Sequence, residues 1–361
     1  MTTPVRWIEL RPGEDADAIR AAIDRVIERG WFVLGPEVEA FEAEFGSATS
    51  SRHTIGVASG TDALILALRA LGIGPGDEVI TTALSAVYTA QAIMMTGARP
   101  VFADLDQERL TLDPDIVANL VTPQTAAILP VHLYGQPADM PALAALADRH
   151  GVALVEDCAQ AHLASSNDAP VGSFGIAAAY SFYPTKNLGA LGDGGAVTTR
   201  DPAVADRVRQ LRVGGQVARD QHTDAAPHSR LDEVQAAILR ARLSWLPGWT
   251  ERRRELGQRY REGLADSAVV LPPELDPGHV YHLFPVRSDR RDELRQHLRA
   301  ADIETLVHYA VPMPAQPAFA TAAPAACPVA EQVCGELVSL PLYPSLDDTA
   351  VDRVIDVIRA W

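Results

Sequence analysis

The amine of Lys186 could act as a nucleophile or as a base. Lys186 stands in SFYPTKNLG (181–189), after a strand-like run and before glycines at 192, 194 and 195. A lysine near glycines is usually a solvated loop residue, but an aromatic strand end and a second apolar strand flank this one. An amine that is partly shielded from water has a lowered pKa, which suits it to attack carbonyls and to accept protons.

Two carboxylates, Glu156 and Asp157, end an apolar strand in VEDCAQ (155–160). In open α/β sheets, ligands bind beyond the carboxyl ends of the strands. A buried carboxylate there needs a charged or hydrogen-bonding partner, and a protonated ring nitrogen of a cofactor would be one. Aspartates at strand ends also occur in turns and metal sites, so this motif alone leaves those interpretations open.

The turn Ser59-Gly60-Thr61 lies between a predicted strand and a predicted helix. The free N–H groups and positive dipole end of a helix N-terminus suit a phosphate, and Gly60 permits close approach of the backbone. The alternative is an ordinary cap formed by Ser59 or Thr61. Ser229 could likewise cap a plain amphipathic helix that presents Leu231, Val234 and Ile238 on one face.

Strands and helices that alternate along the chain are expected to position the candidate site residues. Strands are predicted at 55–58, 78–82, 99–103, 126–131, 153–156, 177–182 and 195–199, and helices at 61–71, 87–95 and 140–150. This alternation is typical of an α/β protein with a mainly parallel central sheet between helices. After Trp245 the pattern predicts helices at 250–264 and 290–301, a strand at 281–287, and two closing helices. We predict a large domain over residues 1–245 and a smaller C-terminal α/β domain over 246–361.

The composition bears on whether the protein binds nucleic acid, membrane or metal, and on the redox state of its compartment. The 361 residues carry 31 basic and 47 acidic side chains, a formal charge of −16, which disfavours general attraction to nucleic acid or anionic membrane. We find no apolar run long enough to span a bilayer. Cys158, Cys327 and Cys334 have no metal-ligand spacing, although Cys327 and Cys334 could in principle pair. We therefore predict no metal, and free thiols in a reducing cytoplasm.

Longer motifs resemble the sugar aminotransferases of the DegT/DnrJ/EryC1/StrS family, from about Ala18 to the C-terminus. They include GWFVLGPEVEAFEAEF (30–45), GVASGTDALILALRALGIGPGDEVITT (56–82), GSFGIAAAYSFYPTKNLGALGDGGAV (172–197) and SRLDEVQAAIL (229–239). The resemblance implies a fold-type I enzyme that uses pyridoxal phosphate. It also implies that Lys186 holds this cofactor as a Schiff base and later moves the α-proton.

The resemblance assigns further cofactor contacts. It implies that Asp157 pairs with the pyridinium nitrogen and that Gln160 lies beside the 3-hydroxyl, while the phosphate cup consists of Gly60, Thr61 and Ser181. It also implies a homodimer with each active site at the subunit interface, where the partner contributes a phosphate contact. His228 stands where relatives have an asparagine for this contact.

Three positions depart from the family pattern. Ala86 replaces the usual aromatic residue that stacks on the cofactor. Tyr88, two residues on, could replace the stack only if the backbone there is not helical, and the alternative is a buried structural tyrosine. The other departures are His228 and the sequence RVGG (212–215), which lacks an aromatic substrate contact. These changes leave the amine chemistry intact and bear on the substrate.

The resemblance implies transfer of an amino group from an amino acid, L-glutamate by analogy, to a ketosugar. The leading hypothesis is a nucleotide (dTDP)-linked 3- or 4-ketohexose, whose diphosphate would need cationic contacts. For each candidate arginine the alternative is a solvated surface charge. The alternatives are a cyclitol or other non-nucleotide ketone, a non-transaminating variant, or a regulatory protein on the same fold. Candidate substrate contacts are Arg212, Arg219, Arg230, His308 and Tyr309.

Overall fold

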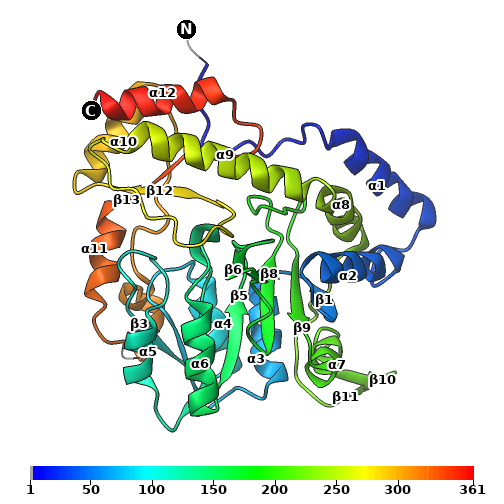
Figure 1. The fold of residues 1–361 in the computed structure, drawn as a ribbon. Coiled ribbons are helices and arrows are strands. Elements are labelled where there is room, and N and C mark those ends of the chain that lie inside the picture. The colour runs from blue at the N-terminus through cyan, green and yellow to red at the C-terminus, as the bar shows by residue number, and fades with distance from the viewer. Residues whose placement is uncertain (1–2, 323) are drawn as a thin grey trace.

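The computed structural model describes residues 3–322 and 324–361, and its centre is a seven-stranded sheet with the order β1-β9-β8-β5-β4-β2-β3 (Figure 1). Five neighbouring strands pair in parallel, while β9 runs antiparallel to both β8 and β1. The predicted mainly parallel sheet is therefore confirmed. The strands are β1 (His53–Val57), β2 (Glu78–Thr82), β3 (Arg99–Ala103), β4 (Thr125–Leu129), β5 (Ala153–Asp157), β8 (Ala177–Ser181) and β9 (Gly195–Thr199).

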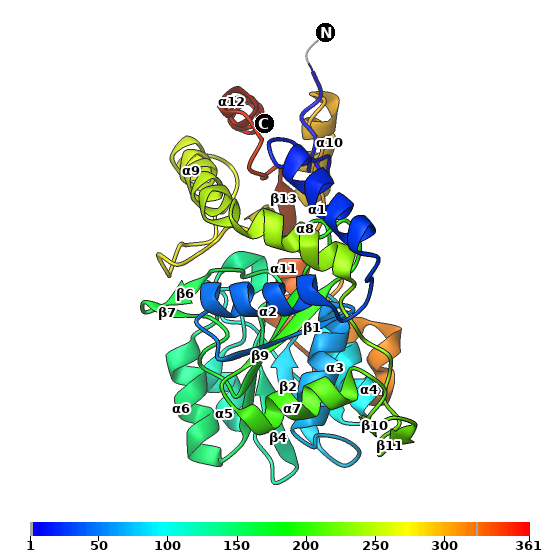
Figure 2. The same cartoon turned by 90° about the vertical axis from the view of Figure 1, so that its right-hand side faces the viewer.

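Helices cover both faces of this sheet because successive apolar side chains of its strands point to opposite sides. Val79 and Ile80 of β2, for example, belong to different hydrophobic clusters. One face packs against α3 (Gly60–Ala70), α4 (Tyr88–Thr96) and α7 (Pro202–Leu211), as Figure 2 shows. The other packs against α2 (Pro36–Ala48), α5 (Pro114–Leu120), α6 (Met140–His150) and α8 (Glu233–Leu243).

The C-terminal part lies above the carboxyl ends of the strands in Figure 1. Its antiparallel pair consists of β12 (Phe284–Arg287) and β13 (Leu337–Leu340), and its helices are α9 (Leu246–Leu264), α10 (Arg291–Ala300), α11 (Pro328–Glu336) and α12 (Asp348–Arg359). Val5 joins this core and bridges to Ile303, so the N-terminal segment packs with the C-terminal part. The domain boundary at 245/246 stays a prediction.

Smaller elements connect these layers. Helix α1 (Ala16–Arg29) packs on α8, and short 3-10 helices cover Leu133–Gly135, Met313–Ala315 and Pro317–Ala322. Two short antiparallel pairs are β6 (Ser165–Ser166) with β7 (Ala169–Pro170), and β10 (Gln216–Ala218) with β11 (Gln221–His222). Among the described residues, every helix is too short or too polar to cross a membrane.

Some boundaries differ from the sequence-based predictions. Helix α9 starts at Leu246 instead of residue 250, because Pro247 sits in the first turn, where a missing N–H costs no helical bond. The strand predicted from residue 281 starts at Phe284, since Tyr281 has a positive φ of 44°. Ser229 does not cap α8; its hydroxyl donates to Asp62 Oδ2 (2.8 Å) and accepts from Ala58 N (3.1 Å).

The buried carboxylate of Glu233 joins α8 to the start of α2. Its oxygens accept hydrogen bonds from the backbone N–H groups of Gly35 (2.9 Å), Glu37 (2.9 Å) and Val38 (2.8 Å). These donors have no acceptor inside α2, because the first N–H groups of a helix precede its first intrahelical bond. The glutamate also places negative charge at the positive end of the helix dipole.

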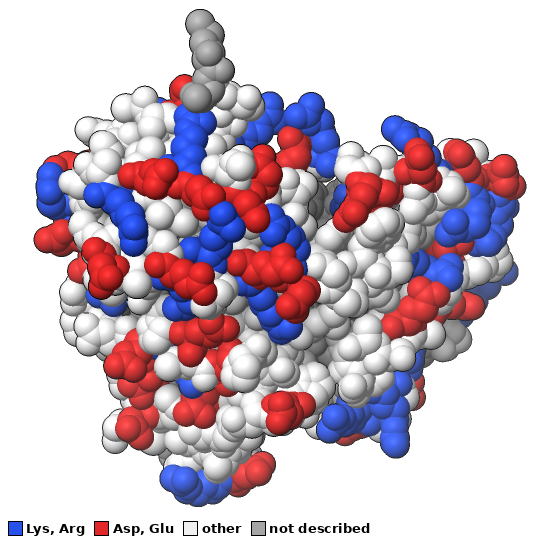
Figure 3. Space-filling model, turned by 45° about the horizontal axis from the view of Figure 1, so that its top comes forward, with Lys and Arg blue, Asp and Glu red and all other residues white. Residues whose placement is uncertain are grey.

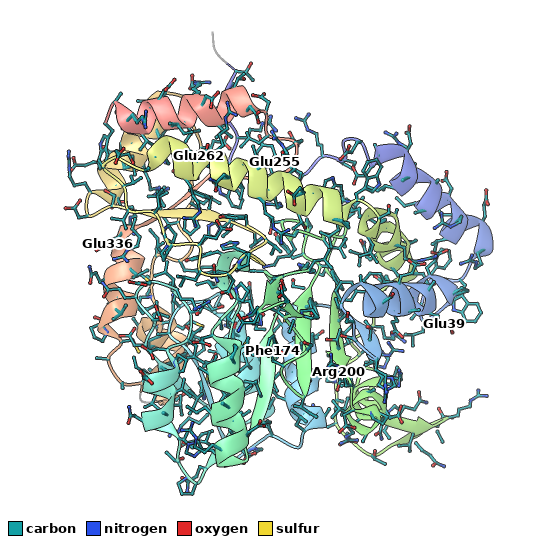
Figure 4. The ribbon with its side chains drawn as sticks, viewed as in Figure 1. Glu39, Phe174, Arg200, Glu255, Glu262 and Glu336 are labelled. Atoms are coloured by element: carbon teal, nitrogen blue, oxygen red, sulfur yellow. The ribbon has the colours of Figure 1, made fainter. Side chains whose placement is uncertain are left out.

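We expect Glu233→Ala to lower the free energy of unfolding by roughly 3 kcal/mol, because it leaves three buried donors unsatisfied. Urea unfolding followed by circular dichroism measures this. The matched control is Glu39→Ala, an exposed acid in the same first turn of α2 that is labelled in Figure 4. Equal effects of the two substitutions would contradict the anchoring role of Glu233.

Candidate active site

The predicted site residues come from strand ends on one edge of the sheet. Asp157 ends β5, Ser181 ends β8, and Gly60 starts α3 directly after β1. The N-terminus of α3 touches the end of β8 closely: a Cβ atom on Gly60 would lie 2.6 Å from the Cβ atom of Ser181. Glycine at position 60 is therefore required for this approach, which brings a helix dipole to the edge where Asp157 lies.

Ser59 caps α3, as one of the two interpretations predicts, because its hydroxyl accepts from Asp62 N (3.1 Å). The first intrahelical bond runs from Ala63 N to Ser59 O. The N–H groups of Gly60 and Thr61 precede that bond and have no helical acceptor. A helix cap and an anion site are therefore compatible at this turn. The Ser59 hydroxyl accepts from the third N–H group of α3, and the N–H groups of Gly60 and Thr61 remain available to a ligand.

Asp157 is a buried carboxylate without a basic partner among the described residues. Its Oδ2 atom accepts from Thr89 Oγ1 (2.9 Å) and its Oδ1 atom from Ala159 N (3.1 Å). Burial raises the pKa of Asp157, while these two donors and Lys186 oppose the rise. The site thus holds a carboxylate that a cationic ligand would stabilise strongly.

Lys186 is half-buried in the turn that follows β8, and it is the only lysine of the chain. Burial lowers its pKa from the ordinary 10.5 to about 8, although Asp157 acts in the opposite direction. The turn is held by Lys186 N, which donates to Tyr183 O (2.8 Å). The neighbouring Asn187 donates to Val280 O (3.0 Å). A large fraction of Lys186 amines is therefore uncharged at weakly alkaline pH.

The amide of Gln160 has a fixed orientation. Its Oε1 atom accepts from Tyr134 N (2.7 Å), and its Nε2 atom donates to Tyr309 Oη (3.0 Å). Burial raises the pKa of Tyr309 to about 12, so its phenol keeps its proton at neutral pH. Gln160 retains one N–H that can face a ligand. The structure therefore places Tyr309, a predicted substrate contact, next to Gln160.

Glu156 has a structural role, unlike its neighbour Asp157. The sequence shows two adjacent carboxylates and does not distinguish their roles. It accepts from the N–H groups of Gly172 (2.7 Å), Phe174 (2.9 Å) and Gly175 (2.7 Å), in the turn before β8. Phe174 marks this turn in Figure 4. His132 Nε2 lies 3.1 Å from the same carboxylate. Glu156 therefore fixes the entry into the strand that leads to Lys186.

The remaining candidates lie in different settings. Arg212 pairs with Glu42 (2.6 Å) and Gly56 O (3.0 Å), so it is not a free cation for a substrate. Burial, and to a lesser extent the charge of Lys186, lowers the pKa of His308 to about 4. The Nδ1 atom of His308 is 2.9 Å from Ser339 Oγ. Arg230 is half-buried, and Arg219 and His228 are exposed.

Tyr88 is 59% exposed at the start of α4, which excludes the buried structural tyrosine that one interpretation predicted. The preceding residue, Val87, is the N-cap of the helix, and its φ of −55° and ψ of −22° are helical. The backbone at Val87 therefore does not provide the non-helical path that Tyr88 would need to replace the missing aromatic stack. A cofactor contact of Tyr88 stays a prediction, and its ring points to solvent in the single chain.

A cavity of about 610 Å³ adjoins the Lys186 turn. Its wall also includes the N-terminal segment 8–15, the start of α9 and residues 343–345, with Arg242, Arg253, Trp245 and Trp249 among its side chains. Figure 3 brings the face with α9 forward and shows basic and acidic side chains interleaved over it. Sequence reasoning missed these residues, since a charged helical segment has the pattern of a solvated helix.

The described residues fit pyridoxal phosphate. Within the described ranges, the carboxylate of Asp157 accepts only from Thr89 and Ala159 and pairs with no basic side chain. The N–H groups of Gly60 and Thr61 have no helical acceptor, and Lys186 offers an amine with a lowered pKa. These are the three chemical features that a protonated ring nitrogen, a phosphate and an aldehyde require.

Known proteins resemble the chain over nearly its whole length. The sequence profile of the DegT/DnrJ/EryC1/StrS aminotransferase family matches residues 14–359. The dTDP-3-amino-3,4,6-trideoxy-alpha-D-glucose transaminase of Streptomyces venezuelae is 50% identical over 359 residues, covering 98% of this chain and 93% of that protein. The erythromycin biosynthesis sensory transduction protein EryC1 of Saccharopolyspora erythraea is 48% identical, covering 98% and 96%. The crystal structure of S. venezuelae DesV has a TM-score of 0.96 at 48% identity, covering 100% and 99%.

We expect Lys186→Met to stabilise the cofactor-free protein at about pH 7, by up to roughly 3 kcal/mol. The pKa of about 8 in the folded chain lies below the ordinary 10.5, so the charged amine penalises folding fully below pH 8. That penalty disappears as pH rises to 10.5, so wild type gains stability across this window relative to the variant.

Urea unfolding of both proteins at several pH values measures the difference. Arg200→Met, which removes an exposed cation labelled in Figure 4, should leave the pH dependence of wild type unchanged. A Lys186→Met protein with the same pH dependence as wild type would contradict the burial of this amine.

Proposed function

The chain belongs to the DegT/DnrJ/EryC1/StrS aminotransferase family, and on this premise we propose that it aminates C3 of a dTDP-linked 3-ketohexose, with L-glutamate as donor and pyridoxal phosphate as cofactor. The observation that carries amine transfer is the half-buried Lys186 beside the buried carboxylate of Asp157. The S. venezuelae transaminase, named for a dTDP-3-amino sugar, supports this acceptor class and favours C3 within the wider 3- or 4-keto prediction.

We propose that Lys186, Asp157 and Gln160 hold the ring end of the cofactor, while Gly60, Thr61 and Ser181 hold its phosphate. When bound, pyridoxal phosphate supplies an electron sink at the carbon that loses its proton, and it carries the amino group between the half-reactions. Asp157 stays ionised beside a protonated ring nitrogen, because each charge relieves the burial cost of the other.

The Nζ atom of Lys186 is the group that we assign to proton transfer. Uncharged, it would accept the α-proton of the donor and, as the resulting ammonium group, would return a proton within the same half-reaction to the cofactor carbon that carries the amino group. In the second half-reaction it would move a proton in the reverse sense, onto the acceptor carbon that gains the amine. A pKa of about 8 suits this cycle, because both protonation states are populated near neutral pH. The adjoining cavity gives both small-molecule substrates access to this turn.

A homodimer with active sites at the subunit interface is the assembly we propose. Trp31, Phe32 and Val33 are 54%, 53% and 36% exposed, although the backbone of this segment is fixed. Phe32 O accepts from Glu233 N (3.2 Å), and Val33 bridges to Asp232. A rigid segment that presents large apolar side chains to solvent is typical of an interface. Tyr183 and Leu191, on either side of Lys186, are also exposed, which supports an active site close to the proposed interface.

We further propose that the enzyme works in the reducing cytoplasm. Cys158, Cys327 and Cys334 are free and buried, and Cys327 and Cys334, which could pair by sequence, remain separate thiols. Free thiols are typical of reducing compartments.

The test of the reaction is a half-reaction screen. The enzyme is loaded with pyridoxamine phosphate, mixed with one ketone at a time, and followed by the return of absorbance from the pyridoxal form. We expect a dTDP-linked 3-ketohexose to react at least about tenfold faster than cyclitol ketones, a difference of about 1.4 kcal/mol. A response to non-nucleotide ketones alone would overturn the proposed acceptor.

Phe32→Asp tests the dimer, because a charge placed in an apolar interface opposes association. We expect the variant to have the mass of one chain in light scattering and to lose most activity. Val270→Asp, at a 59% exposed valine of the C-terminal part, is the control and should stay dimeric. A monomeric Phe32→Asp protein with full activity would rule out a shared active site.

A further inference from the structure

We propose that Thr89 is a positioning residue for the cofactor: its hydroxyl holds the Asp157 carboxylate in the orientation that meets the ring nitrogen, and the hydroxyl of Ser85 supports it. The inference rests on the proposed function, which assigns Asp157 to that nitrogen, and goes beyond it by assigning the side chains that orient Asp157. Ser85 lies between β2 and α4, and Thr89 is the second residue of α4.

The carboxylate of Asp157 is held by one donor on each of its oxygen atoms. Oδ2 accepts from Thr89 Oγ1 (2.9 Å), and Oδ1 accepts from Ala159 N (3.1 Å). The backbone of Asp157 is also fixed, because its N–H group donates to Pro130 O (2.9 Å). The freedom that remains is rotation of the carboxylate about its Cβ–Cγ bond, which is broad for aspartate. The two donors together restrict this rotation, and Thr89 is the one of them that belongs to a side chain.

The direction of each hydrogen bond follows from the charge of Asp157. An ionised carboxylate accepts and cannot donate, so the single hydroxyl proton of Thr89 is given to Asp157. Ser85 Oγ lies 3.2 Å from Thr89 Oγ1 and must then be the donor of that bond. All three side chains are buried. In such a chain each hydroxyl polarises the next, so Ser85 strengthens the bond that Thr89 gives to the carboxylate.

Thr89 also favours the ionised form of Asp157. Burial raises the pKa of Asp157, and the hydrogen bond from Thr89 opposes this rise. Because Thr89 is in the first turn of α4, the carboxylate that it binds lies near the positive end of that helix dipole. Each carboxylate oxygen still has a second lone pair, so a ring N–H can bind without displacing Thr89. Thr89 therefore fixes both the orientation and the charge that a protonated ring nitrogen requires.

A purely structural role is the alternative, and Thr81 provides the comparison. Its buried hydroxyl donates to Leu129 O (2.8 Å), between two neighbouring strands of the same sheet. Thr81→Val therefore removes a buried threonine hydroxyl, as Thr89→Val does, but takes nothing from Asp157. A loss of general stability should appear in both variants, whereas an effect on the ring nitrogen should appear in Thr89→Val alone.

The experiment measures the binding of two ligands to the cofactor-free full-length enzyme by calorimetry. One is pyridoxamine phosphate, which forms no covalent bond with Lys186, and the other is its analogue with a C–H group in place of the ring nitrogen. We expect Thr89→Val to weaken pyridoxamine phosphate binding at least about tenfold, or about 1.4 kcal/mol, and analogue binding by less than about twofold. The reason is that only pyridoxamine phosphate has a ring N–H for Asp157.

Three further variants make this result specific. Thr89→Ser keeps the hydroxyl and should bind both ligands like wild type. Ser85→Ala removes the donor to Thr89 and should weaken pyridoxamine phosphate selectively, but less than Thr89→Val does, and it keeps the test decisive if Thr89→Val does not fold. Thr81→Val should lower the melting temperature and show no selectivity between the two ligands.

The outcomes separate this inference from the proposed function. Equal weakening of both ligands in Thr89→Val and in Ser85→Ala, or no weakening in either variant, would overturn the role of Thr89 and leave the proposed reaction standing. If wild type binds the two ligands equally, Asp157 does not pair with the ring nitrogen, and the inference falls with that assignment. A wild type that prefers pyridoxamine phosphate but aminates no dTDP-linked ketohexose would overturn the proposed acceptor and leave the inference standing.

Discussion

The site depends on the buried carboxylate of Asp157, which accepts only two hydrogen bonds from the described residues. Three buried acids lie close to functional segments, and they differ in how they are satisfied. Glu233 accepts from three backbone N–H groups, and Glu156 accepts from three and contacts His132. Asp157 accepts from one N–H group and one hydroxyl. The first two are complete without a ligand and fix the fold, whereas Asp157 requires a cation to be fully stabilised.

Glu156 and Glu233, whose hydrogen bonds are satisfied within the chain, fix segments that surround the site of Asp157. Glu156 holds the turn before β8, and β8 leads directly into the turn of Lys186. Glu233 ties α8 to α2 and also fixes the exposed segment that we assign to the dimer interface.

Much of the sheet could be predicted from the sequence, because its strands are short apolar runs bounded by turn residues. β2, β3, β9 and α6 have the predicted bounds. The antiparallel direction of β9 was not predicted. The alternation of strands and helices that favours parallel pairing is interrupted there, because no helix lies between β8 and β9. The ion pair of Arg212 with Glu42 and the burial of Arg253 also depend on residues distant in sequence. The site residues that belong to sequence motifs, such as Asp157 and Lys186, could therefore be predicted. The surroundings of Arg212 and Arg253 could not, because tertiary packing determines them.

Borohydride reduction of the holoenzyme, followed by intact-mass measurement and peptide mapping, tests directly whether Lys186 holds the cofactor. Because Lys186 is the only lysine, the amino terminus is the only competing primary amine. We expect one cofactor fixed per chain, on the peptide that contains Lys186, and none in Lys186→Met. A holoenzyme that is active but carries no adduct at Lys186 would contradict this assignment.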